Sequence, residues 1–486
     1  MLVNQLISRG AAGKVALIEK EAVYSYAQLQ ARTESFRDYL YARGIRERDN
    51  VALFAKNSAD FVISYMAIIS LGAVVVPLNT MLTPREIAFI LKDSRVKHVI
   101  TDKELNLAGQ YQDGQLPPEQ LLTSRINQEV NRATYPAAPE ISVPETDPCV
   151  ILYTSGTTGR PKGALLSHRN LISNVRSFTI ATETSAADNI LCVLPMFHSF
   201  GMTCCVLGAL YNGASLTILE SFQPREVIAT IREKGVTVVM GVPAMYGFYA
   251  SMATSADLAG VRLFASGGAS LPLEILNSFY EKTGKRVIEG YGLSEASPAV
   301  CFNPLDATKP GSVGLPLPDV EVKVVRDDGS EAACREVGEL IVRGSNVMLG
   351  YYGLPDETAE ALKDGWLHTG DLAYRDEDGY IYIVDRKKDI IIVSGLNVYP
   401  REVEEVLYQY PAVKEAAVIG KPDKKRGEIV CAYVVAKEGQ KLNKKDLIVF
   451  LKANLASYKL PRDIIEMESL PKNATGKILK KELREF

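Results

Sequence analysis

The residues best suited to chemistry lie in one short stretch, Tyr153 to Gly163, which reads YTSGTTGRPKG. Its glycines allow backbone N–H groups to turn towards an anion, and its Ser and Thr hydroxyls supply further donors. Lys162 adds a mobile positive charge. No Gly-Lys-Ser/Thr follows, so this is not the phosphate loop of ordinary NTPases. We expect a polyphosphate-binding loop of another kind, formed by Thr154, Ser155, Gly156, Thr157, Thr158, Gly159 and Lys162, rather than a solvated turn.

Apolar segments on both sides of this loop predict the elements that position it. Cys149 to Leu152 predicts a short buried strand that runs into the loop. Further strands are expected at 51–54, 73–78, 97–101, 191–194, 215–219, 236–242 and 262–266, with a helix over 58–71. Strands that alternate with helical patterns favour an α/β class with parallel sheets covered by helices.

The pattern changes three times along the chain. Residues 105–145 are polar and weakly patterned, which predicts a surface spacer, and short segments with Asp-Gly turns between 311 and 385 favour antiparallel β structure. A charge run, Asp385 to Asp389, then precedes a new apolar strand. We expect an N-terminal domain over 1–385, made of α/β subdomains and a β-rich subdomain, a hinge at 386–389, and a small mobile α/β domain over 390–486.

Composition excludes several kinds of protein. The 486 residues are too many for one ordinary core, and a net charge of −3 gives no reason to expect nucleic acid as a partner. We see neither a signal peptide nor an apolar segment long enough to cross a bilayer. Seven cysteines without Cys-x-x-Cys spacing indicate reduced, mostly buried thiols and a cytoplasmic protein, and the four scattered histidines indicate no metal cluster.

Five further motifs follow the loop in a fixed order. They are GYGLSE at 290–295, TGD at 369–371, DRKKD at 385–389, SGLNVYP at 394–400 and PKNATGKI at 471–478. With these motifs the chain resembles, over nearly its whole length, the adenylate-forming superfamily of acyl-CoA synthetases, peptide-synthetase adenylation domains and beetle luciferases. The resemblance implies that a carboxylate attacks the α-phosphorus of ATP, which gives an acyl-adenylate and pyrophosphate, and that a thiol then attacks the adenylate. ATP, Mg²⁺ and CoA are the implied cofactors.

The resemblance also implies roles for single residues. Glu295 is similar to the family's Mg²⁺ ligand, with Thr154 as a second metal or phosphate contact. Tyr291 resembles the ring that stacks on adenine, although a core tyrosine is the alternative. Asp371 and Arg386 resemble the pair that holds the ribose, where the alternative for Asp371 is an Asx turn. The remaining nucleotide-site residues are Gly268, Ala269, Glu289, Gly290, Gly292 and Ser294.

Lys477 is the strongest catalytic candidate. It resembles the lysine that bridges the carboxylate and the α-phosphate, and a basic tail is the alternative because other cations lie nearby. For the thiol step, the resemblance implies that the C-terminal domain rotates about Lys388. This rotation brings in Ser394 and Gly395 as contacts of pantetheine. Leu396 stands where many relatives carry Gly or Glu, so the resemblance does not decide whether residue 396 contacts pantetheine.

The acyl pocket is expected beside the phosphate loop. Its candidate residues are Phe197, Gly201, Met202, Cys205, Gly241, Gly267 and Pro298, with His198 as a gating residue beside the carboxylate or, alternatively, a core histidine. Cys204, Cys205 and Gly208 could leave a groove along one helix face. These segments contain no Lys or Arg, which disfavours dicarboxylic acids. His198 stands where amino-acid-activating relatives carry Asp, and no carrier segment follows Phe486, which favours free CoA.

The sequence of residues 288–298 is most similar to those of bacterial fatty-acid–CoA ligases. The resemblance therefore implies an AMP-forming acid–thiol ligase whose substrate is a medium- to long-chain fatty acid. An aryl or short or branched acid is the alternative on the same scaffold. A luciferase-like oxygenase is less favoured because the pocket segments show no obvious aromatic slot for a luciferin. A non-catalytic nucleotide-binding relative is less favoured because Lys477 and Glu295 are both present. The sequence leaves open whether the protein is a monomer or a homodimer.

Overall fold

The computed structural model describes residues 1–111, 116–154, 160–474 and 476–485. A seven-stranded sheet holds the phosphate-loop strands, in the order β18-β8-β7-β4-β3-β5-β6. Its central strands are parallel, and only β8 and β18 run antiparallel to their neighbours. The strands are β3 (Asn50–Phe54), β4 (Val74–Pro77), β5 (His98–Thr101), β6 (Glu119–Leu122), β7 (Pro148–Thr154), β8 (Lys162–Ser167) and β18 (Gly350–Tyr351).

A nine-stranded sheet follows the order β15-β14-β13-β12-β11-β9-β10-β1-β2 and is parallel from β13 to β1. Its strands are β1 (Val15–Glu19), β2 (Ala22–Ser25), β9 (Asn189–Cys192), β10 (Ser215–Ile218), β11 (Val238–Gly241), β12 (Leu263–Ser266), β13 (Val287–Gly292), β14 (Ala299–Phe302) and β15 (Leu315–Pro316). One hydrophobic core is shared by both sheets and by α2, whose apolar residues are buried all round.

Helices cover these sheets. They are α1 (Tyr26–Ala42), α2 (Ala59–Ser70), α3 (Pro84–Asp93), α4 (Thr123–Arg132), α5 (His168–Thr182), α6 (Gly208–Tyr211), α7 (Pro224–Glu233), α8 (Pro243–Met252), α9 (Leu273–Thr283) and α10 (Pro355–Ala361). Local chemistry sets several starts, as in α3, where Thr83 caps the N-terminus, Glu86 completes a capping box and Pro84 occupies the first turn.

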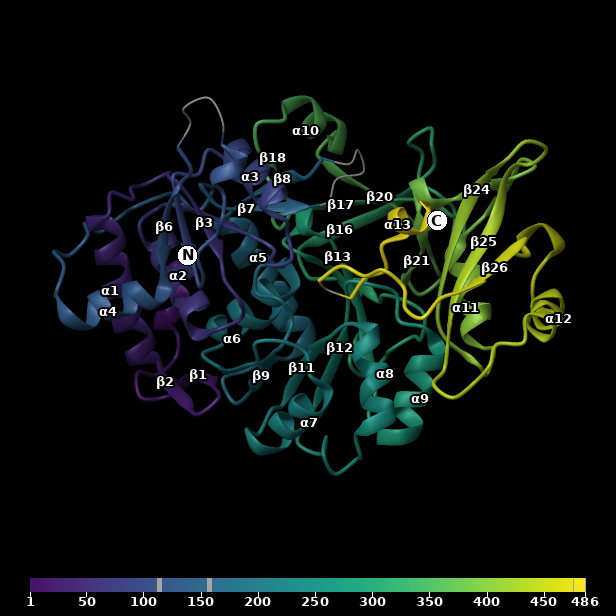
Figure 1. Cartoon of the computed structure of the whole chain (residues 1–486), viewed down its shortest axis with the longest axis horizontal. Coiled ribbons are helices and arrows are strands. Elements are labelled where there is room, and N and C mark those ends of the chain that lie inside the picture. The colour runs from purple at the N-terminus through teal and green to yellow at the C-terminus, as the bar shows by residue number, and fades with distance from the viewer. Residues whose placement is uncertain (112–115, 155–159, 475, 486) are drawn as a thin grey trace.

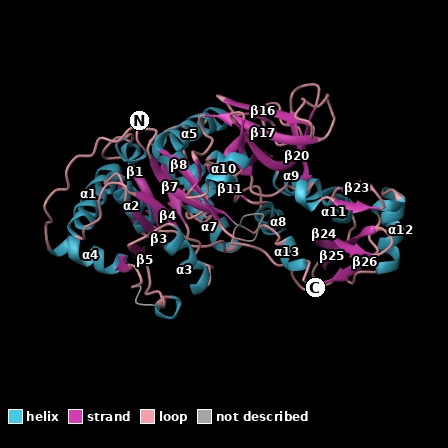
Figure 2. Ribbon diagram, turned by 90° about the horizontal axis from the view of Figure 1, so that it is seen from above, coloured by secondary structure: helices cyan, strands magenta, loops and turns pink. Residues whose placement is uncertain are grey.

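A third sheet is antiparallel, as the short segments with Asp-Gly turns predict. It contains β16 (Val320–Val325), β17 (Gly338–Gly344), β19 (Leu362–Lys363), β20 (Trp366–Arg375) and β21 (Ile381–Arg386). This sheet lies between the seven-stranded sheet and the C-terminal elements (Figures 1 and 2).

The C-terminal elements form a fourth sheet with cores of their own. Its strands are β22 (Ile391–Val393), β23 (Leu396–Val398), β24 (Val413–Asp423), β25 (Gly427–Ala436) and β26 (Asp463–Glu466), and its helices are α11 (Pro400–Tyr408), α12 (Lys444–Asn454) and α13 (Lys480–Leu483). A 3₁₀ turn, Lys387–Asp389, connects β21 to β22. Figure 1 shows these elements at one side of the molecule, in yellow and green.

Most of the predicted elements are confirmed within a few residues. The surface spacer over 105–145 is wrong, because this segment contains β6 and α4. β6 adds to the sheet through backbone pairing with β5, with His98 opposite Glu119 and Thr101 opposite Leu122, and a polar edge strand has little side-chain pattern to reveal it. α4 buries only Thr123 and Ile126, so its apolar face is too narrow to detect by pattern.

The bulk expectations can also be compared with the structure. All seven cysteines are free and six of them are buried, as their spacing predicts. Within the described residues, no three metal-ligating side chains gather into a cluster. None of the described helices combines the length and the apolarity that crossing a membrane requires.

Candidate active site

Two polar side chains surround the carboxylate of Asp371. The register of β20 and β21 sets Asp371 opposite Arg386, whose Nε lies 3.0 Å from Asp371 Oδ1. From the neighbouring end of β13, the Tyr291 hydroxyl donates to Asp371 Oδ2 at 2.6 Å. Asp371 raises the pKa of Arg386, and burial followed by this carboxylate raises the pKa of Tyr291. The sequence motifs GYGLSE, TGD and DRKKD therefore meet at one buried carboxylate.

A second carboxylate, Glu295, lies in a 3₁₀ turn (Ser294–Ala296) directly after β13. Tyr351 on β18 donates its hydroxyl to Glu295 Oε1 at 3.0 Å. Lys162 places Nζ 5.2 Å from the centre of the same tyrosine ring. No other hydrogen bond reaches the Glu295 carboxylate from the described part of the chain, so Oε2 is available for a cation.

The two ends of the phosphate loop lie beside this carboxylate turn. Thr154 and Lys162 are paired across β7 and β8, and Thr154 Oγ1 lies 3.5 Å from the Lys162 carbonyl oxygen. The loop residues Ser155, Gly156, Thr157, Thr158 and Gly159 lie outside the described residues. Mg²⁺ is commonly bound through one or two carboxylates plus phosphate oxygens. Glu295 with Thr154 fits that requirement, although no three-carboxylate cluster exists among the described residues.

His198 is held in one orientation at the start of the pocket segment. Its Nδ1 accepts a hydrogen bond from Phe200 N at 3.2 Å, so the neutral ring carries its proton on Nε2. Burial and then repulsion from Lys477 lower the pKa of His198 to about 4. Ser199 Oγ lies 3.4 Å from Ser294 Oγ, which connects this segment to the Glu295 turn. At neutral pH the ring is therefore a neutral donor, not a cation.

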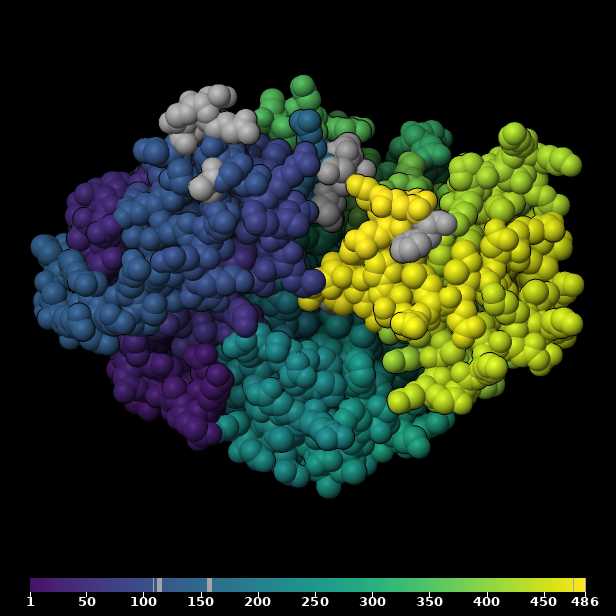
Figure 3. Space-filling view, viewed as in Figure 1, coloured from purple at the N-terminus to yellow at the C-terminus, as the bar shows by residue number. Residues whose placement is uncertain are grey.

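Lys477 reaches the same region from the far end of the chain. Its backbone is paired in a tight turn, in which Asn473 N donates to the Lys477 carbonyl oxygen and Asn473 Oδ1 accepts from Lys477 N, both at 2.9 Å. The preceding Gly476 lies against Val242, since a methyl group there would be 3.6 Å from Val242 Cγ2. Figures 1 and 3 show this segment, in yellow, extending from the C-terminal elements across to the N-terminal part.

The electrostatic surroundings of Lys477 identify what it faces. Loss of hydration and then repulsion from Arg386 lower its pKa to about 8, while Asp371 acts in the opposite direction. The ammonium is thus near enough for its charge to act on Asp371, Arg386 and His198, while the side chain itself is exposed to solvent. A cation near other cations that lacks an ion pair among the described residues is suited to receive an anionic ligand.

Contacts beyond Lys477 hold the C-terminal elements in this arrangement. Arg401 at the start of α11 donates its backbone N–H to Asp385 Oδ2 at 2.9 Å and its guanidinium to the Ile383 carbonyl oxygen. Arg484 donates to Asp389 Oδ1 at 2.7 Å, next to the connecting turn. Lys388 in that turn is exposed.

Some predicted nucleotide-site residues have evident backbone roles. A methyl group at Gly292 would lie 2.2 Å from the Pro298 carbonyl oxygen, so this close approach requires glycine. Gly290 similarly packs against Phe302. The Glu289 carboxyl group is buried, and its Oε1 accepts from Leu271 N at 3.0 Å, which secures the loop that contains Gly268 and Ala269.

The candidate acyl-pocket residues are neighbours at the ends of adjacent strands. Gly267 after β12 donates to the Gly241 carbonyl oxygen at the end of β11 at 3.1 Å, and Pro298 precedes β14. Gly267 faces the Phe200 ring, which opens a π-helical segment, Phe200–Leu207. Phe197 is partly exposed, whereas Gly201, Met202 and Cys205 are buried in or beside this segment. Cys204 and Cys205 are both buried, and the groove expected along the helix face of Cys204, Cys205 and Gly208 stays a prediction.

Ser394 and Gly395 are not brought into the cluster. They form the exposed two-residue tip between β22 and β23, with Val393 paired to Leu396 on either side. Both residues have positive φ angles, 51° and 81°, which is the geometry of the turn that favours glycine in tight hairpins. No atom lies within 4 Å of the position that a Gly395 side chain would occupy.

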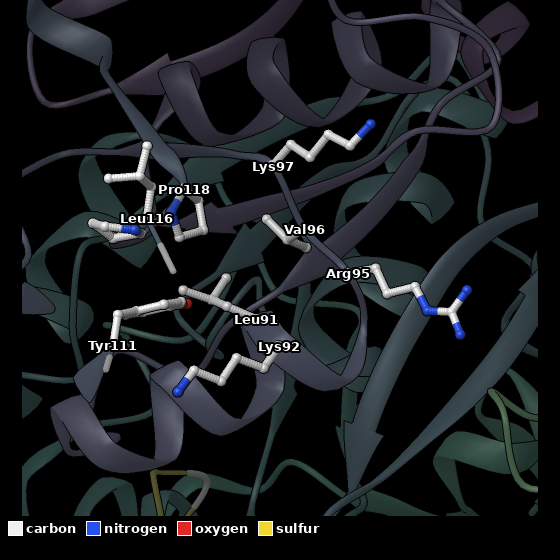
Figure 4. A pocket seen from close by; sticks show the side chains of 9 residues that line it. Leu91, Lys92, Arg95, Val96, Lys97, Tyr111, Leu116 and Pro118 are labelled. Atoms are coloured by element: carbon white, nitrogen blue, oxygen red, sulfur yellow. The ribbon is translucent and has the colours of Figure 1, made fainter. Parts of the chain in front are cut away.

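Sequence reasoning missed Tyr351. The Gly350-Tyr351-Tyr352 sequence carries no charge, and only the pairing of β18 with β8 brings it to Lys162 and Glu295. A surface pocket near the end of α3, lined in part by Leu91, Tyr111 and Pro118, lies apart from these residues. Its cations, Lys92, Arg95 and Lys97, point in different directions (Figure 4), so they do not converge on one ligand position.

Comparisons with known proteins agree with this geometry. The model of the AMP-binding enzyme family matches residues 7–352, and that of the AMP-binding enzyme C-terminal domain matches residues 402–477. A long-chain-fatty-acid–CoA ligase from Bacillus subtilis is 36% identical, with 92% of this chain and 87% of that protein covered. A feruloyl-CoA synthase from Amycolatopsis is 37% identical, with 95% and 93% covered.

Similarity to a solved structure extends to both parts of the molecule. The o-succinylbenzoate CoA synthetase of Bacillus subtilis, in complex with ATP and a magnesium ion, superposes with a TM-score of 0.89 at 30% identity. The match covers 99% of this chain and 98% of that one.

Glu289 yields a prediction about stability and pH. Burial raises its pKa to about 7, so the folded state favours the protonated form. This contribution to stability is complete below the ordinary glutamate pKa and is lost as the pH rises towards 7. We expect Glu289→Gln to have the same free energy of unfolding as the wild type near pH 4.5. Near pH 8 its free energy of unfolding should be larger than that of the wild type by about 1–3 kcal/mol.

Urea unfolding between pH 4.5 and 8 measures this difference. The exposed Glu274 on α9 provides the control, and Glu274→Gln should leave the pH dependence as it is in the wild type. A Glu289→Gln variant whose stability runs parallel to the wild type across this range would contradict the assignment.

Proposed function

The chain belongs to the AMP-binding enzyme family of adenylate-forming acyl-CoA ligases, and we propose that the acid it activates is a medium- to long-chain fatty acid. The observation that carries the proposal is the arrangement of Asp371 with Arg386 and Tyr291, over which the C-terminal segment brings Lys477 near a pocket segment without charged side chains. In this arrangement the residues would serve the first half-reaction.

In that half-reaction a carboxylate oxygen attacks the α-phosphorus of ATP, the bond to the β-phosphate oxygen breaks, and pyrophosphate leaves. Two anions must approach each other, so positive charge and hydrogen-bond donors must be in place beforehand. Lys477 would bind the carboxylate and the α-phosphate together, and His198 Nε2–H would donate to the same carboxylate. Tyr291 would stack on adenine, while Asp371 accepts hydrogen bonds from the ribose hydroxyls.

Glu295 and Thr154 would hold Mg²⁺, which when bound offsets the negative charge of the phosphates. Lys162, whose ammonium lies beside the Tyr351 ring, would bind the phosphate tail. Together these groups place positive charge along the polyphosphate before reaction.

In the second half-reaction the CoA thiol attacks the acyl carbon, AMP leaves with the bonding electrons, and the thiol proton is released. Ser394 and Gly395 are exposed and distant from the cluster here, so this step requires a second arrangement. We propose that residues 390–486 rotate as a unit about 386–389, with Lys388 as the pivot. The separate cores on the two sides of this turn support such a rotation.

The pocket segments support a hydrophobic acid. Among Phe197, Gly201, Met202, Cys205, Gly241, Gly267 and Pro298 there is no charge to pair with a second carboxylate, and burying one unpaired would be costly. The 36% identity to a long-chain-fatty-acid–CoA ligase supports the aliphatic choice. An aryl acid is the second candidate, and the 37% identity to a feruloyl-CoA synthase is the observation in its favour.

The substrate is tested by pyrophosphate release with ATP across free acids from two to eighteen carbons, with benzoate, cinnamate and ferulate, each with and without CoA. We expect the highest kcat/KM on aliphatic acids of medium or long chain, and CoA should be required for turnover. A maximum on an aromatic acid would replace the fatty acid by the second candidate.

Lys477→Ala tests the first arrangement. Removing the ammonium should slow adenylate formation by about 100-fold or more, as the loss of one charge-stabilising donor does elsewhere. A supplied acyl-adenylate should still react with CoA at nearly the wild-type rate. Rapid-quench measurement of each half-reaction checks this.

Lys472→Ala is the matched control, since Lys472 lies in the same segment but pairs with Glu415 at 2.7 Å. It should leave both half-reactions unchanged. Equal loss of both half-reactions in Lys477→Ala would contradict the two-arrangement model.

Gly395→Leu tests the second arrangement. Because nothing lies near this position here, the added side chain should spare adenylate formation. It should slow thioester formation by about 100-fold, because a small displacement of a reacting group has that effect.

Gly439→Leu controls for backbone strain, because Gly439 also has a positive φ, 74°, and no neighbour within 4 Å. It lies in the loop between β25 and α12. Thioester formation at the wild-type rate in Gly395→Leu would remove this glycine from the CoA site.

A further inference from the structure

Residues 345–352 form a clamp between the phosphate-loop hairpin and the Glu295 turn. On one side, Leu349 N donates to the Leu165 carbonyl oxygen at 2.9 Å and Tyr352 N donates to that of Gly163 at 2.8 Å. On the other side, Met348 N donates to the Glu295 carbonyl oxygen at 2.8 Å. The clamp thus fixes the distance between the strand that carries Lys162 and the turn that carries Glu295.

Two asparagines brace the clamp. Asn170 on α5 donates its amide to the carbonyl oxygens of Ser345 and Val347, both at 2.8 Å. Asn346 donates to the Ala296 carbonyl oxygen at 2.9 Å, directly after Glu295. The backbone on both sides of Tyr351 is therefore held independently of the Tyr351 side chain.

The Tyr351 side chain contacts both charged groups at once. Its hydroxyl donates to Glu295 Oε1 at 3.0 Å, and its ring lies 5.2 Å from Lys162 Nζ. A tyrosine hydroxyl ordinarily has a pKa near 10, so it is protonated at neutral pH and can donate to the carboxylate. One tyrosine can orient the metal-binding carboxylate and the phosphate-binding ammonium together.

We propose that Tyr351 is a positioning residue that prepares Glu295 to bind magnesium and Lys162 to bind the polyphosphate. This proposal rests on the function proposed above. The hydroxyl bond to Oε1 restricts the rotation of the carboxylate, and Oε2, which accepts no hydrogen bond from a described residue, would be available to the cation. Hydrogen bonds to metal-ligating carboxylates commonly change metal affinity by 10- to 100-fold. The ring face attracts the ammonium and limits where it can move.

The test measures equilibrium binding of ATP, with and without Mg²⁺, by isothermal titration calorimetry in the absence of any acid. Tyr351→Phe keeps the ring and removes the hydroxyl. We expect its ATP affinity without Mg²⁺ to equal that of the wild type, and the Mg²⁺ concentration for half-maximal enhancement to rise about tenfold.

Tyr352→Phe is the matched control, because it makes the same change one residue later. The Tyr352 hydroxyl lies 3.2 Å from Asn50 Nδ2, on the side of the sheet that carries α3. Its Mg²⁺ dependence should equal that of the wild type. Wild-type Mg²⁺ dependence in Tyr351→Phe, or an equal loss of ATP affinity with and without Mg²⁺, would overturn the proposal.

A double variant and a second substitution test the two contacts of Tyr351 separately. In a Glu295→Gln background, Tyr351→Phe should have no additional effect on Mg²⁺ dependence, and an additive effect would overturn the route through Glu295. Tyr351→Leu should also weaken ATP binding without Mg²⁺, since Lys162 loses the ring. These binding measurements need no turnover, so an inactive wild type would overturn the proposed function alone.

Discussion

The ion pair between Asp371 and Arg386 is the interaction on which the rest of the site depends. Asp371 is almost completely buried, and a buried carboxylate is stable only when charged and polar partners surround it. Arg386 and Tyr291 are those partners. Because Arg386 ends β21 directly before the turn to the C-terminal elements, the same pair anchors the site and the root of the part that carries Lys477.

Arg386 also affects the protonation of Lys477. Two cations face one carboxylate, and Arg386 is close enough to lower the pKa of Lys477 to about 8. Lys477 forms no ion pair with a described residue, so no such pair has to break when an anionic ligand binds. The neutral His198 beside it avoids a third positive charge, which burial in this place would not support.

Around the expected phosphate site, backbone hydrogen bonds rather than ion pairs fix the relative positions of Lys162 and Glu295. The clamp of residues 345–352 is fixed to β8 and to the Glu295 turn by main-chain hydrogen bonds and two asparagine amides. Such bonds hold position at little entropic cost once the sheets are formed. The side chain of Tyr351 then contacts both Glu295 and Lys162, two groups that are 133 residues apart in the chain.

The sequence alone determined the fold class, most strands and the identities of the charged site residues, because side-chain patterns and short motifs are local properties. It also predicted that Lys477 belongs to a separate C-terminal domain. Only the tertiary structure decided which groups meet: Tyr291 with Asp371, Lys477 with His198, and Tyr351 with Glu295. The edge strand β6 and the role of Tyr351 depend on backbone pairing between distant segments. Such pairing leaves no mark on the residues themselves, since any side chain can accompany a backbone hydrogen bond.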